Sequence, residues 1–254
     1  LKERGYPLVT GVVAGHDIVE HVVPTRREVE RTVKIVFIES VVDAIDIIKK
    51  TVSEERCVCW LRNTVKDVFN AYDMLASLNE IPSEKIDVFH SRFTLKDRIE
   101  IEKKIIKYFG NDSGYVERNG RVLLATQVVE QSLDLDFDVL ITDLAPIDLL
   151  IQRAGRLHRH VRDEKGNRIG VGETSRRPHP VLYIHIPPDT FEPKKSWYSE
   201  TFKGASYVYH DHSLLWRTKE ILKKTGSIAM PGQARLLIES VYGENPIEAP
   251  EVFN

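Results

Sequence analysis

The sequence predicts an α/β fold in which a parallel sheet is flanked by helices. Between Val33 and Ile186, short runs rich in Val, Ile, Leu and Phe alternate with longer stretches of helical periodicity. This alternation is typical of βα units, and strands that are apolar along their whole length are typical of a parallel sheet covered on both faces. The candidate strands are Val33–Ile38, Arg56–Leu61, Lys85–His90, Arg121–Thr126, Val139–Thr142 and Val181–Ile186.

Three helices are expected between these strands. Glu39–Val52 and Val65–Leu78 both carry apolar residues at intervals of three and four, which is the spacing of one helix face. A third helix begins at Thr94, which forms a capping-box pattern with Asp97. We expect Gly110 to end this helix in the left-handed conformation that glycine favours.

Breaks in the periodicity predict how the chain is divided. Pro187-Pro188 ends the last strand, and His212–Lys224 and Gln233–Tyr242 are expected to be two helices of a small helical appendage. Leu1–Arg31 is interrupted by glycine and proline, so we expect it to connect from a preceding domain. The predicted boundaries are 1–32 for this connection, 33–187 for the α/β lobe and 188–254 for the appendage or linker.

The composition is that of a soluble globular protein. The chain has 254 residues, 42% hydrophobic and 29% charged, so it can bury a sizeable core. No run approaches the roughly 18 apolar residues that span a bilayer, which argues against a membrane role. Because the chain begins at Leu1 without an initiating Met or a signal peptide, we expect a fragment of a longer cytoplasmic protein. The only cysteines, Cys57 and Cys59, share one face of a predicted strand and are expected to be reduced packing residues.

The charge pattern by itself says little about partners. The formal net charge is −2, which does not indicate a nucleic-acid partner. From Arg153 to Arg177 there are eight Lys or Arg against three Asp or Glu, a local excess of positive charge. Such a run is usually a solvated face, and Asp163–Pro180, which lacks periodicity, is expected to be a surface loop.

The pattern Gln152-x-x-Gly155-Arg156-x-x-Arg159 carries the strongest functional signal. On a helix, spacings of i+4 and i+3 place Gln152, Arg156 and Arg159 within about 60° of one another. The guanidinium fork binds phosphate oxygens in pairs, and Gly155 would let a partner approach closely. A solvated basic face would explain the arginines but neither the glycine nor the aligned glutamine. The opposite side of this helix carries the apolar residues Ile147, Leu150, Ile151 and Ala154.

This pattern resembles motif VI of the superfamily 2 helicases. The resemblance implies that Arg159 and Arg156 act as the arginine finger and sensor on the γ-phosphate of ATP bound to another lobe. It also implies that Gln152 orients the γ-phosphate or the attacking water, and that Gly155 belongs to the ATP-binding surface.

The segment Leu124–Asp136 resembles motif V of the same superfamily. It leaves a predicted strand at Thr126 and enters a short helix, a place where backbone N–H groups and a hydroxyl can hold a phosphate. The resemblance implies that Thr126 contacts a nucleic-acid phosphate and that Asp134 approaches the ribose of ATP. An ordinary βα turn would look similar, but the position one strand before Gln152 favours the motif.

Two further strand ends resemble nucleic-acid contacts of these helicases. Phe89–Arg92 resembles the segment that touches the DNA backbone, and Leu61–Thr64 resembles motif IV. A polar cluster at a strand end is more often a turn than a ligand site. The assignment of these two segments is therefore supported only by the nearby segments that resemble motifs V and VI. The nucleic-acid contacts implied by resemblance are Thr126, His90, Ser91, Arg92, Thr64 and Arg62.

The residues of Ala125–Asp138 and Asp143–Arg159 closely resemble the CRISPR-associated helicase-nuclease of type I interference systems. Two later segments, Leu214–Thr218 and Leu237–Gly243, also resemble segments of that family. This resemblance implies a RecA-like second lobe, of the P-loop NTPase type, in an ATP-dependent 3′ to 5′ motor on single-stranded DNA. A crRNA-guided surveillance complex would recruit the motor, and a separate HD nuclease domain would cut the DNA.

Half of such an active site is missing from the sequence. There is no Gly-x-x-x-x-Gly-Lys-Ser/Thr loop and no Walker B strand. We therefore expect ATP and its Mg²⁺ to be held by a first RecA-like lobe elsewhere. This chain alone is expected to bind ATP weakly and to hydrolyse essentially none.

Three alternatives remain open from the sequence. A superfamily 2 RNA or repair helicase would share motifs V and VI, and a non-hydrolysing nucleic-acid-binding module would share the basic surface. A metal phosphohydrolase is suggested by His16-Asp17 and His210-Asp211-His212. Both clusters lie beside loop-like sequence, so no metal site is expected.

Overall fold

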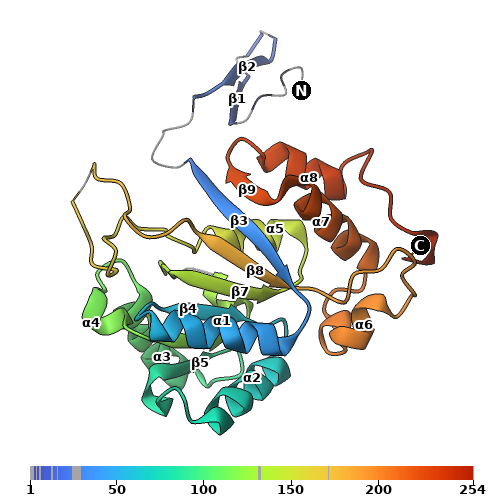
Figure 1. Cartoon of the computed structure of the whole chain (residues 1–254). Coiled ribbons are helices and arrows are strands. Elements are labelled where there is room, and N and C mark those ends of the chain that lie inside the picture. Colours follow the sequence, from blue (N-terminus) through green and yellow to red (C-terminus); the bar gives the residue numbers. More distant parts are fainter. Residues whose placement is uncertain are drawn as a thin grey trace.

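The protein forms a sheet layered between helices. The computed structural model describes residues 3, 5, 7–12, 14, 15, 17–24, 30–130, 133–170 and 172–253. Seven strands form the main sheet in the order β5-β6-β4-β7-β8-β3-β9, and the first six of these are mutually parallel (Figure 1). Their bounds are β3 (Arg31–Ile38), β4 (Val58–Leu61), β5 (Ile86–Phe89), β6 (Val122–Ala125), β7 (Val139–Asp143) and β8 (Val181–His185). The predicted α/β fold with a parallel sheet is confirmed.

Helices cover both faces of this sheet. On strand β4, Val58 and Trp60 belong to one hydrophobic core, whereas Cys59 and Leu61 belong to the other. The first core is covered by α1 (Val41–Ser53) and α2 (Val65–Leu78). The second core is covered by α3 (Leu95–Phe109), α5 (Ile147–Ala154), α7 (His212–Thr225) and α8 (Ala234–Tyr242). Shorter turns of helix are α4 (Tyr115–Arg118), α6 (Trp197–Thr201), η2 (Ser83–Lys85), η3 (Gln127–Glu130), η4 (Ala205–Tyr207) and η5 (Glu251–Phe253).

The ends of α3 confirm one expectation and correct another. Thr94 caps the helix as predicted, because its hydroxyl accepts the N–H of Asp97. Gly110 is not left-handed, since its φ is −78° and its ψ is −180°. A β-carbon at Gly110 would lie 2.4 Å from the carbonyl oxygen of Ile106. Glycine is therefore needed at this position for space rather than for a positive φ.

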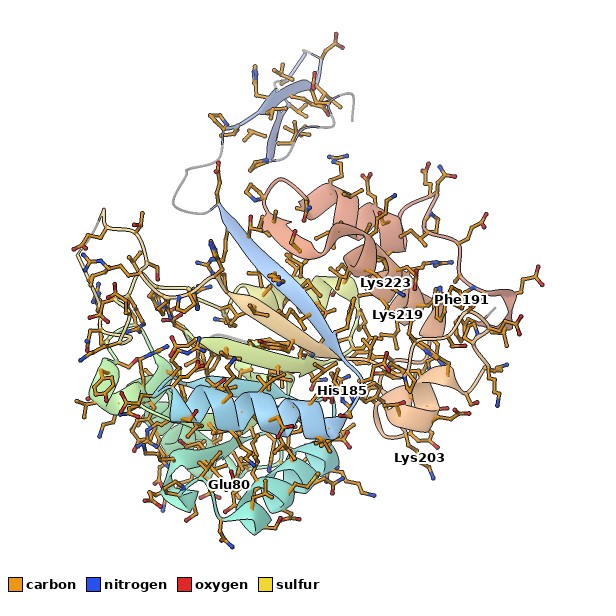
Figure 2. The ribbon with its side chains drawn as sticks, viewed as in Figure 1. Glu80, His185, Phe191, Lys203, Lys219 and Lys223 are labelled. Atoms are coloured by element: carbon orange, nitrogen blue, oxygen red, sulfur yellow. The ribbon has the colours of Figure 1, made fainter. Side chains whose placement is uncertain are left out.

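The C-terminal segment is joined to the lobe more closely than its predicted helices suggest. Strand β9 (Ser227–Met230), which the sequence analysis does not predict, adds antiparallel to β3 at the edge of the main sheet. Lys219 on α7 is only 1% exposed and lies 3.8 Å from the Trp216 ring, and its ammonium is 2.9 Å from Asp189 (Figure 2). Trp216 belongs to the same core as Cys59 and Leu61 of β4, so residues after 188 share this core of the lobe.

Near the N-terminus, β1 (Leu8–Gly11) and β2 (Val19–Val22) pair as a separate antiparallel sheet. Cys57 and Cys59 are both free and fully buried, as expected for packing residues. Among the described residues, no helix combines the length and the apolarity that crossing a membrane would need.

Candidate functional site

The predicted nucleic-acid contacts follow neighbouring strands at the carboxyl edge of the sheet. Strands β4, β5 and β6 are parallel neighbours, so their carboxyl ends meet. The backbone N–H of Thr126 donates to the carbonyl of Phe89 over 3.1 Å, and that of Arg62 donates to the carbonyl of Ala125 over 2.8 Å. The structure therefore brings the three segments together.

The turn after β5 presents exposed polar groups. Ser91 and Arg92 are exposed, whereas His90 is buried and stacks on Phe93 with ring centroids 4.1 Å apart. The Nδ1 atom of His90 accepts the backbone N–H of Arg92 over 3.2 Å. Burial, together with the charge of Arg92, lowers the pKa of His90. The imidazole thus supports the turn, while Arg92 and Ser91 face solvent.

The two threonines predicted to contact nucleic acid have different surroundings. Thr64 caps helix α2, because its hydroxyl accepts the N–H of Asp67 over 3.2 Å and donates to the Asp67 carboxylate over 2.5 Å. Thr126 lies between β6 and η3, as the sequence predicts, and is 4% exposed. The Thr126 side chain is thus almost covered by the residues around this strand-to-helix turn.

Arg62 lies inside the protein instead of on its surface. It is 6% exposed, its Nε donates to Asp143 over 2.9 Å, and its guanidinium lies 4.6 Å from the Trp60 ring. Burial raises the pKa of Asp143, but the charge of Arg62 and the contact with His185 together outweigh burial and lower this pKa to about 2. The guanidinium of Arg62 is thus committed to an internal ion pair.

The pattern from Gln152 to Arg159 is not one continuous helix. Helix α5 ends at Ala154 with Gly155 as its C-cap, and His158 has a positive φ of 48°. The expectation that Gln152, Arg156 and Arg159 share a helix face is therefore wrong, because the chain turns before the arginines. The apolar side of the helix is as predicted, since Ile147, Leu150 and Ala154 are buried and Ile151 is partly buried.

The predicted finger arginines have different surroundings. Arg156 donates to the carbonyls of Leu133 and Glu130, so it joins the turn to the segment after β6. The side chain of Arg159 is 44% exposed, and its Nε donates to Asp134 over 2.5 Å. Burial raises the pKa of Asp134, but the Arg159 hydrogen bond and the neighbouring charges of His160, Arg159 and Arg156 together lower it below its ordinary value. Gln152 is exposed on α5.

Arg153, to which the sequence pattern assigns no role, is fully buried between these segments. Its Nε donates to Glu130 over 2.7 Å, and its guanidinium also donates to the Thr142 hydroxyl over 2.5 Å and to the Asn63 side chain over 3.3 Å. Arg153 therefore links α5 to η3, to β7 and to the end of β4. Its position three residues after Leu150, within the apolar side of the helix, is the signal that would have found it.

A second buried cluster corrects the interpretation of the basic segment as a solvated loop. Arg162 is fully buried and Arg177 is 7% exposed, and both guanidiniums bind Asp136. Asp138 binds Arg177 and Arg118, each over 2.8 Å. The described residues of the loop 163–180 form no long strand or helix, as predicted, but its ends are anchored because these arginines neutralise two buried carboxylates.

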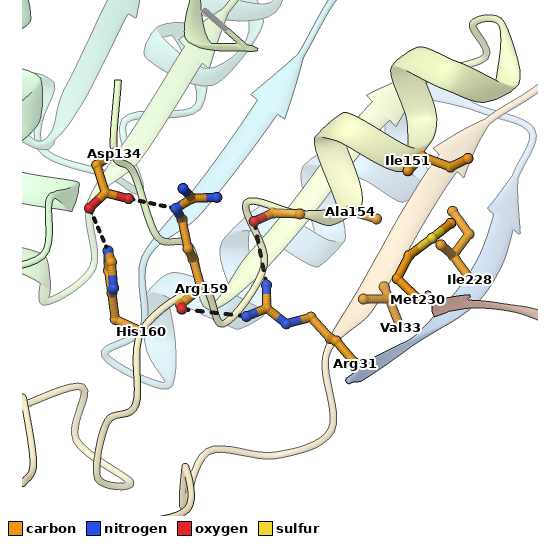
Figure 3. A pocket seen from close by; sticks show the side chains of 10 residues that line it. Arg31, Val33, Asp134, Ile151, Ala154, Arg159, His160, Ile228 and Met230 are labelled. Carbon is orange, nitrogen blue, oxygen red and sulfur yellow. Dashed lines mark hydrogen bonds and ion pairs between the residues drawn. The ribbon is translucent and has the colours of Figure 1, made fainter. Parts of the chain in front are cut away.

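Arg159, Asp134 and His160 stand at the mouth of a cavity of about 450 Å³ between the end of α5 and strands β3 and β9 (Figure 3). Its apolar lining includes Ile151, Ala154, Val33, Ile228 and Met230, and Arg31 closes the polar side. Such a mouth offers a permanent cation to a phosphate and a carboxylate to a hydroxyl.

The two His/Asp clusters singled out in the sequence, His16-Asp17 and His210–His212, are candidate metal ligands by residue type. Within the residues that the structure describes, no three His, Cys, Asp or Glu side chains are grouped to hold an ion. His16 lies outside the described residues. Asp211 caps α7, because its carboxylate accepts the N–H of Ser213 over 2.9 Å.

Comparisons with known proteins agree on one family. Residues 54–162 match the family model "CRISPR-associated nuclease/helicase Cas3, C-terminal". The "CRISPR-associated endonuclease/helicase Cas3" of Escherichia coli is 37% identical over 197 residues, which cover 76% of this chain and 20% of that protein. The chain thus spans about a fifth of the length of such curated relatives.

Two solved structures are similar over nearly the whole chain. "T. fusca Cas3-ATP" has a TM-score of 0.77 at 27% identity, covering 96% of this chain and 28% of that one. A chain of "CRISPR RNA-guided surveillance complex, pre-nicking" has a TM-score of 0.75 at 27% identity, covering 96% of this chain and 29% of that one.

Proposed function

Because the chain belongs to the Cas3 family, of which it is a C-terminal helicase lobe, we propose that it is the second motor lobe of an ATP-dependent helicase acting in CRISPR interference. The whole protein would move 3′ to 5′ along single-stranded DNA. Its first RecA-like lobe would hold ATP and Mg²⁺, its HD domain would cut the DNA, and a crRNA-guided surveillance complex would recruit it. The similarity to a chain of such a complex supports the last partner.

The exposure of Arg159 at the mouth of the cavity carries this proposal. A finger must reach a nucleotide on another lobe, and Arg159 is an exposed permanent cation with one exposed carboxylate partner, Asp134. When the lobes close, the γ-phosphate would replace Asp134 on Arg159, and Asp134 would turn to the ribose hydroxyls. Asp134 would keep its contact with His160, whose Nε2 lies 3.2 Å from the carboxylate.

The neighbouring residues complete the nucleotide site. Arg156 would sense the state of the nucleotide through its bonds to the carbonyls of Leu133 and Glu130. Gln152, exposed near the end of α5, would orient the γ-phosphate or the water. Gly155 adds no side chain between the cavity and the nucleotide.

DNA would bind along the carboxyl edge of the sheet. Arg92 and Ser91 supply exposed donors, and Thr126 supplies a hydroxyl at a strand-to-helix turn. His90 and Thr64 would act by supporting these turns, because His90 accepts the Arg92 N–H and Thr64 caps α2. Contacts of this kind read phosphates and not bases, which suits a motor that must pass any sequence. Arg62 is left out of this surface because it is ion-paired inside the lobe.

Substituting Arg159 in the protein that carries both lobes tests the proposal. Arginine fingers are worth roughly 10³–10⁵ in rate in well-studied phosphoryl-transfer enzymes. We expect Arg159→Ala to lower kcat for ATP by about 10³-fold with little change in KM, because the first lobe still binds the nucleotide. The isolated lobe should hydrolyse no ATP.

Arg176→Ala is the matched control, since its side chain is 54% exposed and pairs with nearby Glu173. Unchanged hydrolysis in Arg159→Ala would reject the finger assignment. Comparing stimulation by single-stranded DNA and by RNA tests the substrate: stimulation by RNA alone would assign the lobe to an RNA helicase.

A further inference from the structure

Arg31, the first residue of β3, reaches the backbone of the segment that carries Arg159. Its guanidinium donates to the carbonyls of Leu157 over 3.0 Å, of Gly155 over 3.4 Å and of Arg159 over 3.4 Å. Figure 3 shows this side chain extending from β3 across the polar side of the cavity. One side chain thus holds three carbonyls that lie more than a hundred positions away along the chain.

These carbonyls lie in the turn after helix α5, where no intrahelical N–H is available to them. The last carbonyls of a helix and of the turn after it lack the intrahelical partner that earlier carbonyls have. Within the described part of the chain, no backbone N–H reaches the carbonyls of Gly155, Leu157 or Arg159. A cation is also favoured at the C-terminal end of a helix dipole. Arg31 meets both requirements.

The opposite side of the same segment is held by residues 136–138. The N–H of Phe137 donates to the carbonyl of Arg156 over 2.9 Å, and the N–H of His158 donates to the carbonyl of Phe137 over 3.1 Å. The Asp136 carboxylate accepts the N–H of Arg159 over 2.8 Å. The segment 155–159 is therefore gripped along one edge by 136–138 and along the other by Arg31.

We propose that Arg31 is a positioning residue for Arg159, which clamps the backbone of residues 155–159 so that the finger projects toward the nucleotide. Its catalytic consequence rests on the proposed function of Arg159. The clamp itself is a property of this lobe and can be tested separately.

The choice of side chain follows from geometry. A planar guanidinium has five N–H donors in a fixed fork, which allows one residue to bind several carbonyls at once. Arg31 uses two separate nitrogens for this set, whereas a lysine ammonium carries its three donors on one nitrogen and so cannot match the same spacing of carbonyls. A methionine keeps an unbranched side chain of similar reach but removes every donor.

The experiment uses the protein that carries both lobes, with Arg31→Met, Arg31→Lys and the control Arg176→Met. Steady-state ATP hydrolysis gives kcat and KM, and hydrogen exchange gives the protection of the amides from Arg156 to Arg159. We expect Arg31→Met to lower kcat by about 10- to 100-fold, because small displacements of a positioned group cost this much. KM should change by less than about threefold, since the nucleotide is held by the other lobe.

Arg31→Met should also lower the protection of these four amides by at least about tenfold, which corresponds to a stability loss for this segment alone. Arg31→Lys should lie between wild type and Arg31→Met in both measurements, and Arg176→Met should match wild type. A raised KM with unchanged kcat would instead make Arg31 a direct nucleotide ligand and overturn the proposal.

The two proposals fail in different ways. If Arg159→Ala leaves hydrolysis unchanged, the finger is rejected, and Arg31 is judged by hydrogen exchange alone. In that case lost protection in Arg31→Met keeps the clamp, whereas unchanged protection rejects it. If Arg159→Ala abolishes hydrolysis but Arg31→Met matches the control in both kcat and exchange, the finger stands and the clamp is rejected.

Discussion

His158 sits in the turn between the two predicted finger arginines, and its surroundings favour the neutral imidazole. Its backbone has a φ of 48°, and its Nε2 lies 3.2 Å from the carbonyl of Asp138. Burial, and then the charge of Arg177, lowers the pKa of His158 to about 4. The turn is therefore built for an uncharged histidine that bonds to the 136–138 segment.

This shift predicts a loss of stability in mild acid. Because the folded pKa is depressed, the unfolded chain binds the proton more tightly, so the stabilisation is complete above the unfolded pKa near 6.5 and is lost as pH falls toward 4. By pH 5 the loss from His158 should be about 1–2 kcal/mol. Urea unfolding at pH 7.5 and pH 5 would measure this loss.

The control for this effect is His158→Asn, because asparagine tolerates the left-handed conformation and does not titrate in this range. Burial also lowers the pKa values of His90 and His160, so both proteins should weaken in acid. The wild type should weaken more. An equal loss in the two proteins would show that His158 does not carry the effect.

The sequence does not show which arginines of this site are buried in structural ion pairs and which are exposed and free to bind a ligand. Arg153 is fully buried, whereas Arg159 is exposed, although both belong to one short sequence pattern. The difference depends on Glu130 and Asp134, which lie more than twenty positions away and approach only in the fold. The sequence therefore predicts which segments form the site, but not which guanidinium remains available.

At the level of elements, the loop 163–180 is fixed at its base by buried charge. Asp136 accepts from Arg162 and Arg177 and also from the backbone N–H of Arg159. The loop and the finger segment therefore depend on one carboxylate. The sequence shows the excess of basic residues but not their burial, because the balancing Asp136 and Asp138 precede them in another segment.

Removing this carboxylate charge should destabilise the lobe. Asp136→Asn keeps the shape but leaves three buried guanidiniums with only the Asp138 carboxylate, and breaking a buried ion pair costs about 3–5 kcal/mol. Asp112→Asn is the matched control, because Asp112 forms an exposed pair with Arg168 that should be worth less than about 1 kcal/mol. Urea unfolding gives the two free energies. Similar values for the two variants would contradict a structural role for the cluster.

For the whole molecule, the parallel sheet is predictable because every central strand is apolar on both faces. The six predicted strands all form, and their carboxyl ends bring the motif segments together. Strand β9 is not predicted because only Ile228 within it is buried and the strand pairs at the sheet edge. The turn after α5 is not predicted because the residue spacing typical of a helix continues through Arg159. The chain nevertheless leaves the helix there, where it bonds to Arg31 and to residues 136–138.

The net charge of the chain bears on how DNA binding should depend on salt. With a formal net charge of −2, long-range attraction is weak, so binding should depend on the few cations that touch phosphates. Each phosphate contact on a single strand contributes about −0.7 to the slope of log K against log salt. Loss of exposed Arg92 at the carboxyl edge should therefore remove about one such contact.

In the protein that carries both lobes, Arg92→Ala should make the salt slope for single-stranded DNA shallower by about 0.7. The affinity should fall by the same factor for a homopolymer and for a mixed sequence, because phosphates carry no sequence information. Arg176→Ala, whose side chain pairs with Glu173, should leave the slope unchanged. A fluorescence-anisotropy titration at several salt concentrations measures both variants. If Arg92→Ala weakened binding without changing the slope, Arg92 would act by shaping the turn after β5 and not by meeting a phosphate.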